Sequence, residues 1–331
     1  MELQPVYNAR VFHADELQVG PEFQIGQEAH MPTLRTTPRR LPTAGFVLAL
    51  AACGGTIVEQ PSVPTTIATA AATPVPSPRI EAGLMEGIFQ VGDRNLFLSC
   101  RGDGSPTIIY FTGMGGLRSN AGSVPDAFTD ELRWCSYDRP NGPSSQSDPV
   151  DGPQLGSDAA ADLHGLLEAA DVPGPYLLVG GSFGGLLATT FAGTYPDEVA
   201  GIVLLDAILP THDEIHNAIP EASRGQVMAE AEANPEKFVF QASLEEAKSL
   251  MTNLPDVPVA FLGAEPIEAP TAFLAYDKEP VVEVIRQTRE DFVAQFTGGR
   301  ITYVEAPHFM EPVVPGAIIE EVRGVLEDIA A

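Results

Sequence analysis

Short runs of consecutive apolar residues recur from Gly87 onwards, and each predicts a buried strand. A predicted hairpin, GIFQV and NLFLSC, comes first. It is followed by runs at 107–113, 133–138, 176–180, 199–207, 257–264 and 301–306. Apolar residues return at helical spacing over 157–171 and 183–194, and a last helix is expected at about 316–329. Continuous apolar strands separated by helices predict an α/β fold, a mostly parallel sheet with helices on both faces.

One segment interrupts this alternation. Residues 208–255 lie between two predicted strands, are acidic and have a largely helical pattern. We expect them to form a small helical cap over the strand ends. With 331 residues, 44% of them hydrophobic, the chain can build one large domain, which we assign to residues 81–331.

The amino-terminal part has a different character. Residues 1–52 are interpreted as a leader, with a signal peptide at 31–52 and residues 1–30 not translated if Met31 is the start. Arginines precede an apolar stretch that is too short to span a bilayer, and LAAC resembles a bacterial lipobox that would lipidate Cys53. Residues 53–80, rich in Thr, Pro and Ala, are expected to be a tether.

A lone serine among glycines is the strongest chemical signal. Ser182 is the centre of G-x-S-x-G, directly after a predicted strand and before a predicted helix. A tight turn there would expose the hydroxyl, and side chains at Gly180 and Gly184 would collide with neighbouring backbone. The position predicts a catalytic nucleophile.

A nucleophilic serine needs a base and an acid. His308 follows the last predicted strand, at the sheet edge where Ser182 also opens, and is the expected general base. Asp206 ends one strand at that edge and Glu265 follows the next. We favour Asp206 as the acid, and Glu265 remains the alternative.

The tetrahedral intermediate of acyl transfer also needs hydrogen-bond donors for its oxyanion. The residue after the nucleophile supplies one, which makes the Phe183 amide the first candidate. The loop after strand 107–113 should supply the second, and we select the Met114 amide.

Five segments together resemble the blocks of the α/β-hydrolase superfamily in its order: CRGDGSPTIIYFTG, CSYDRPNGPSS, PYLLVGGSFGG, YPDEVAGIVLLDA and APHF. The resemblance covers about 87–329 and implies an eight-stranded sheet of order 1-2-4-3-5-6-7-8. It places Cys100 and Cys135 on neighbouring strands, where a disulfide could form. The sequence departs from the family at Thr112 and Gly181, where His is common, and has no Asp after the penultimate parallel strand.

Charge excludes one class of partner. The chain has 45 acidic and 18 basic residues, a net charge of −27, and such a surface repels nucleic acid. His212 and His216 have zinc-motif spacing, but Asp213 stands where the catalytic Glu would be, so no metal is predicted. The loop 113–116 lacks the last glycine of a dinucleotide site.

These observations predict a serine hydrolase that cleaves a small-molecule carboxylic ester without a cofactor. A prolyl-type aminopeptidase or amidase on the same triad, and a catalytically silent surface-binding domain, are the alternatives. We expect an exported monomer, held at the outer face of a bacterial cytoplasmic membrane only through its amino-terminal lipid.

Overall fold

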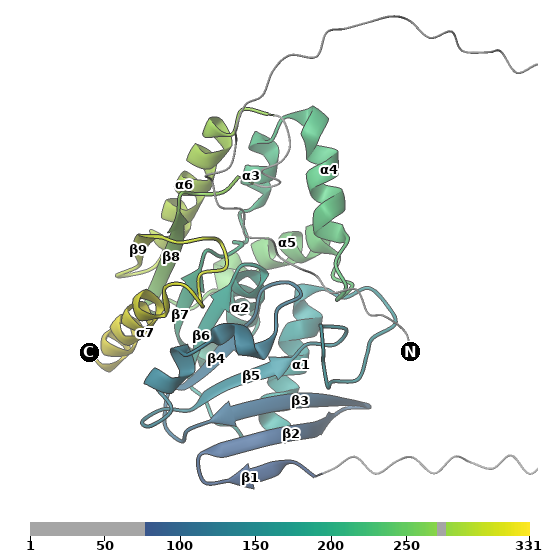
Figure 1. Cartoon of the computed structure of the whole chain (residues 1–331), viewed down its shortest axis with the longest axis vertical. Coiled ribbons are helices and arrows are strands. Elements are labelled where there is room, and N and C mark those ends of the chain that lie inside the picture. Colours follow the sequence, from purple (N-terminus) through teal and green to yellow (C-terminus); the bar gives the residue numbers. More distant parts are fainter. Residues whose placement is uncertain (1–76, 270–275) are drawn as a thin grey trace, which may run out of the picture. The chain divides into compact units, whose positions relative to one another are not determined.

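A computed structural model of the chain describes residues 77–269 and 276–331. Within them nine strands form one sheet of order β1-β2-β3-β5-β4-β6-β7-β8-β9 (Figure 1). The strands are β1 (Arg79–Glu81), β2 (Leu84–Val91), β3 (Arg94–Arg101), β4 (Thr107–Phe111), β5 (Trp134–Asp138), β6 (Tyr176–Gly181), β7 (Val199–Leu205), β8 (Val259–Glu265) and β9 (Arg300–Glu305).

The predicted α/β-hydrolase topology is confirmed. Strands β4 to β9 run parallel to one another, as does β5 beside β4, while β1, β2 and β3 pair in antiparallel fashion. From β2 onwards the order is the one that the family resemblance implies. The described sheet differs by one added edge strand, β1, which starts at Arg79 in the last residues of the expected tether.

Two separate apolar layers cover the two faces of the central parallel strand β4. Ile108 and Tyr110 of β4 pack in one cluster with α7 (Pro315–Ala330). The alternating residues Ile109 and Phe111 pack on the other face with α1 (Gly156–Ala169) and α2 (Phe183–Thr194). Because successive side chains of a strand point to opposite faces, both faces need apolar residues.

The segment that the sequence assigns to a cap contains the helices α3 (Asp213–Ala218), α4 (Glu221–Glu232) and α5 (Phe240–Ser249). Helix α5 contacts α1 and α2, so part of the segment belongs to the body of the domain. Helix α3 contacts α6 (Glu279–Val293), a helix that the sequence pattern did not predict. An apolar cluster that includes Ile215, Val227 and Ile285 joins α3, α4 and α6.

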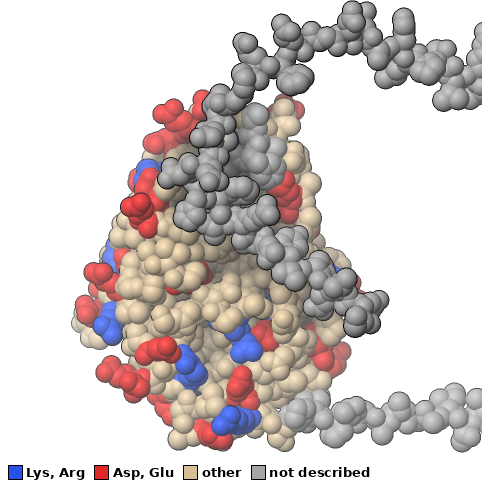
Figure 2. Space-filling view, in the orientation of Figure 1, with Lys and Arg blue, Asp and Glu red and all other residues tan. Residues whose placement is uncertain are grey.

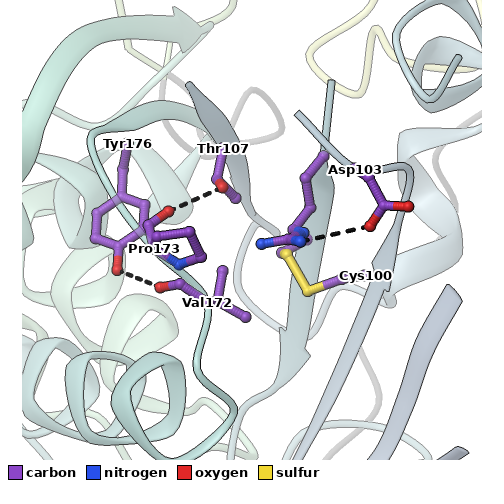
Figure 3. The surroundings of a disulfide bond; sticks show 8 residues. Cys100, Asp103, Thr107, Val172, Pro173 and Tyr176 are labelled. Carbon is purple, nitrogen blue, oxygen red and sulfur yellow. Dashed lines mark hydrogen bonds and ion pairs between the residues drawn. A yellow bond between two sulfur atoms is a disulfide. The ribbon is translucent and has the colours of Figure 1, made fainter. Parts of the chain in front are cut away.

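The expected disulfide is present. Cys100 of β3 and Cys135 of β5 are directly opposite in the antiparallel register, with Cα atoms 4.1 Å apart. Figure 3 shows it near the start of β4, where the Thr107 hydroxyl donates a hydrogen bond of 3.0 Å to the Pro173 carbonyl. Both cysteines are fully buried and belong to the apolar cluster between the sheet and the helices α1 and α2.

Several expectations concern residues outside the described ranges, namely the leader 1–52, the lipidated Cys53 and the tether up to residue 76. Among the described residues, no helix combines the length and apolarity that a membrane crossing requires. On the face in Figure 2, acidic side chains lie mainly along the periphery, with Lys and Arg among them, around a broad uncharged area.

Candidate active site

Ser182 lies on a strained turn between β6 and α2. Its φ of 51° is in the left-handed region, which a non-glycine residue rarely adopts. A Cβ at Gly184 would lie 2.1 Å from the Phe111 carbonyl oxygen, and one at Gly180 would lie 2.6 Å from the Gly184 carbonyl oxygen. Only glycine fits at either position, which accounts for the G-x-S-x-G pattern.

Three predicted residues meet at the carboxyl edge of the sheet. His308, in the loop after β9, has its Nε2 2.9 Å from the Ser182 Oγ. Its Nδ1 is 2.6 Å from Oδ2 of Asp206, which directly follows β7. With Nδ1 protonated, His308 donates to the carboxylate and its Nε2 accepts the serine proton, the arrangement of a nucleophile, a base and an orienting acid.

The two candidate acids have different partners. Asp206 contacts His308, whereas the carboxylate of Glu265 is 3.1 Å from a guanidinium nitrogen of Arg286. The Glu265 side chain is 46% exposed and the Asp206 side chain 7%. The geometry therefore brings Asp206, and not Glu265, to the imidazole.

Asp206 is buried but remains a carboxylate. Burial by itself would raise its pKa, but the hydrogen bond with His308 and the charge of Arg289 outweigh burial and hold the pKa below its usual range. A guanidinium nitrogen of Arg289 is 2.7 Å from Oδ1, and the Ala264 amide donates to the same oxygen at 3.1 Å. These contacts satisfy the oxygen that does not face the histidine.

Both proposed oxyanion donors lie beside Ser182. Phe183 is the first residue of α2, and the amides of a first helical turn have no acceptor within the helix. A Cβ at Gly113 would be 3.3 Å from the Ser182 Cβ, so the peptide that carries the Met114 amide begins next to the serine. Met114 and Phe183 both line the cavity that contains Ser182.

This cavity has a volume of about 510 Å³. Most of its wall comes from apolar side chains of the β7–α3 connection and of the helices above it. Besides Ser182, Asp206, His308 and Arg289, the lining includes Ile208, Leu209, Ile215, Val227, Phe240 and Ile285, together with His212, His216, Glu230, Asn234 and Glu268. A cavity of this size suits a substrate with a medium-sized apolar portion.

Two histidines in the wall are held neutral. Burial, followed by the repulsion that positive charge on His216, Arg289 and His308 would exert, lowers the pKa of His212 to about 3. Burial also lowers the pKa of His216, although Asp213 opposes it. The two rings lie 5.0 Å apart, and no group of three or more metal-ligating side chains exists in the described part of the chain.

A family model described as the alpha/beta hydrolase fold matches residues 106–282, which include Met114, Ser182 and Asp206. The chain belongs to the alpha/beta-hydrolase family. As an alpha/beta hydrolase it has distant curated relatives. The uncharacterized protein YqjL of Bacillus subtilis is 27% identical over 165 residues, 50% of this chain and 64% of the relative. The chain thus spans less than two thirds of the length of the curated relatives it matches.

Solved structures agree on the fold. Alpha/beta hydrolase domain-containing protein 10 from mouse superposes with a TM-score of 0.53 at 17% identity, over 73% of this chain and 98% of the mouse chain. Cfl2 from Burkholderia cenocepacia superposes with a TM-score of 0.51 at 19% identity, over 76% and 99%. At such identities the likeness extends to the fold and not to the substrate.

Three residues of this alpha/beta hydrolase that touch the site were not predicted from the sequence. Arg289 binds Asp206, while Arg139 and Glu236 form an ion pair next to residues 112–116, which we call the oxyanion loop after the proposed role of Met114. A charged residue among polar helix positions carries no local signal of what it will contact. Arg139 is within a segment that resembles the family, yet nothing in the sequence pairs it with Glu236.

Proposed function

We propose that this protein is a serine hydrolase that cleaves carboxylic esters through an acyl-enzyme. The observation that carries the proposal is the continuous hydrogen-bonded series from Ser182 through His308 to Asp206, with distances of 2.9 Å and 2.6 Å. Ser182 opens into the apolar cavity, so a bound acyl group could reach its Oγ.

In the first half of the reaction, the Ser182 Oγ attacks the ester carbonyl while His308 Nε2 takes its proton. Asp206 keeps the ring in the tautomer that leaves Nε2 free, and it stabilises the imidazolium that forms. The amides of Phe183 and Met114 donate to the oxyanion. When the intermediate collapses, His308 returns the proton to the departing alcohol.

In the second half, water attacks the acyl-Ser182 ester. His308 takes a proton from the water and then protonates the Ser182 Oγ as the acid is released. Apart from the substrate and the attacking water, both halves use only side chains and amides of this chain, and the same two amides serve both tetrahedral intermediates.

An activity-based probe tests the nucleophile. Purified protein is treated with a fluorophosphonate and the adduct is mapped by peptide mass, with Ser182→Ala as the control. We expect one adduct, on Ser182, and none in the variant. Absence of labelling in correctly folded protein would contradict the hydrolase and favour a silent binding domain. Initial rates on p-nitrophenyl esters from acetate to decanoate then test the reaction, with the highest kcat/KM expected at intermediate chain lengths.

A second candidate, a prolyl-type aminopeptidase, draws on two exposed carboxylates. Glu230 of α4 and Glu268 after β8 both line the cavity and could hold the free amine of a peptide. Proline p-nitroanilide distinguishes the two functions. Turnover of the anilide that exceeds turnover of every ester, and that is lost in Glu230→Gln or Glu268→Gln, would replace the esterase by the peptidase.

Location is a further part of the proposal. The lipobox-like sequence before Cys53 supports export and lipidation. The buried disulfide is of the kind that persists in an oxidising compartment. Expression of the full chain in a bacterium with an alkyne-labelled fatty acid should label the wild type and leave Cys53→Ala unlabelled. Equal labelling of both proteins would overturn the anchor.

A further inference from the structure

A buried ion pair borders the oxyanion loop without touching the triad. Arg139 directly follows β5, and Glu236 lies in the connection between α4 and α5. Arg139 is 5% exposed and Glu236 is 0% exposed. The pair is bidentate: Nε donates to one carboxylate oxygen, and Nη2 donates to the other at 2.9 Å. A connection between cap helices is thereby joined to the sheet.

The same pair also binds the backbone of the oxyanion loop. Arg139 Nη1 donates to the Thr112 carbonyl at 2.8 Å, and Nη2 donates to the Gly113 carbonyl at 2.6 Å. Glu236 Oε1 accepts a hydrogen bond of 2.6 Å from the Gly115 amide. The peptide groups on both sides of Met114 are therefore held by charged side chains.

These contacts determine where the Met114 amide points. The Gly113 carbonyl and the Met114 N–H belong to one planar trans peptide, in which the two groups point in opposite directions. Fixing the carbonyl on Arg139 fixes the N–H on the side away from Arg139. The Gly115 amide is occupied by Glu236, and the Gly116 amide donates to Gly113 at 3.0 Å. The Met114 amide is left without an acceptor among the described residues.

The positive charge of Arg139 also makes the Met114 amide a stronger hydrogen-bond donor. Burial lowers the pKa of Arg139, but the adjacent Glu236 carboxylate raises it by more, so the guanidinium stays protonated. A positive charge on the Gly113 carbonyl polarises the peptide and makes the Met114 N–H a stronger donor. A buried ion pair is often no more stabilising than apolar residues of similar size, so stability alone gives a weak reason for it.

We propose that Arg139 and Glu236 are positioning residues that orient and polarise the Met114 amide as an oxyanion donor. This role rests on the proposed serine-hydrolase function. It makes the connection between α4 and α5 part of the transition-state machinery, although neither side chain touches the substrate.

The test replaces both charges at once, because removing one leaves the other buried and unpaired. In Arg139→Met/Glu236→Met, kcat on the best p-nitrophenyl ester should fall about 30-fold, below the 10²–10³ of losing an oxyanion donor outright. KM should change by less than about threefold, since ground-state contacts remain. Arg300→Met/Glu321→Met, a partly buried pair joining the start of β9 to α7, is the matched control and should retain wild-type kcat.

A trifluoromethyl ketone, which forms a hemiketal with Ser182, distinguishes a misoriented Met114 amide from a general disturbance of the active site. Its affinity should fall in parallel with kcat/KM in the double variant, while a non-covalent carboxylate product should bind as in the wild type. If the double variant does not fold, Arg139→Lys is tested instead. It keeps the positive charge but cannot make the simultaneous hydrogen bonds of the planar guanidinium, so its kcat should fall at least fivefold. A folded double variant, or a folded Arg139→Lys, with kcat within twofold of wild type would overturn the role.

Failure of this inference differs from failure of the proposed function. If the wild type is neither labelled by the fluorophosphonate nor active on esters, the proposed hydrolase function is wrong, and so is the positioning role that rests on it. If the wild type is labelled and active and the charge-free variant is equally active, only the positioning role is wrong.

Discussion

Replacing Cys100 and Cys135 by alanine should destabilise the domain by about 4–5 kcal/mol. The disulfide closes a loop with a sequence separation of 35 residues. Chain entropy alone assigns a cross-link of that span about 4 kcal/mol at 25 °C. The cysteines are 1% and 0% exposed, so losing their sulfur atoms leaves small voids that add on the order of 1 kcal/mol. For a domain of this size the melting temperature should fall by about 8–10 °C.

Equilibrium unfolding in urea measures the difference, on wild type, on the double variant and on wild type unfolded and refolded in reductant. The third sample keeps both sulfur atoms and loses only the cross-link, so it should lie between the other two. Because the sulfur atoms are buried, reduction must be carried out on the unfolded chain. A loss of less than 1 kcal/mol in both altered samples would refute the reasoning that the cross-link limits the unfolded state.

Three further predictions concern the site. Asp206→Asn should lower kcat on esters about 10³–10⁴-fold through the wrong imidazole tautomer, whereas Glu265→Gln should leave it within twofold; the reverse ranking would make Glu265 the acid. Because the unfolded chain protonates His212 below about pH 6.5 and the folded chain only near pH 3, wild-type stability should fall as the pH drops through that window, by at most on the order of 5 kcal/mol. Thermal unfolding of the wild type and of His212→Phe at pH 7 and pH 4 measures this, and the variant should lose less stability at pH 4 than the wild type. Equal losses of stability in the two proteins would show that His212 is not the group responsible. Gly184→Ala should abolish both ester turnover and fluorophosphonate labelling, since its Cβ would lie 2.1 Å from the Phe111 carbonyl oxygen; retained labelling would show that the turn can shift.

The parallel strands and the serine turn could be predicted because their causes are local. Each buried strand needs apolar residues on both faces, so it appears as an uninterrupted run, and the turn at Ser182 excludes side chains at Gly180 and Gly184. His308 could be placed at the same edge because strand direction alone carries its loop there.

Other features could not be predicted because nothing in their own stretch of sequence indicates them. Strand β1 has three residues, all exposed, and it forms only because β2 offers an edge. Helix α6 was missed, and with it Arg289, whose buried contact with Asp206 joins distant parts of the chain. The choice between Asp206 and Glu265 stayed open for the same reason, since each ends a strand at the right edge and only packing assigns their partners.

The order in which the chain supplies the three side chains of the proposed triad has a consequence for biosynthesis. Ser182 follows β6 and Asp206 follows β7, but His308 follows β9, the last strand of the described sheet. A nascent chain that has folded as far as β8 carries a serine and an acid without a base. Its hydroxyl stays inert until β9 pairs with β8 and brings the imidazole to the edge. The proposed hydrolase would therefore become active only after the strand that precedes His308 has been made and has paired.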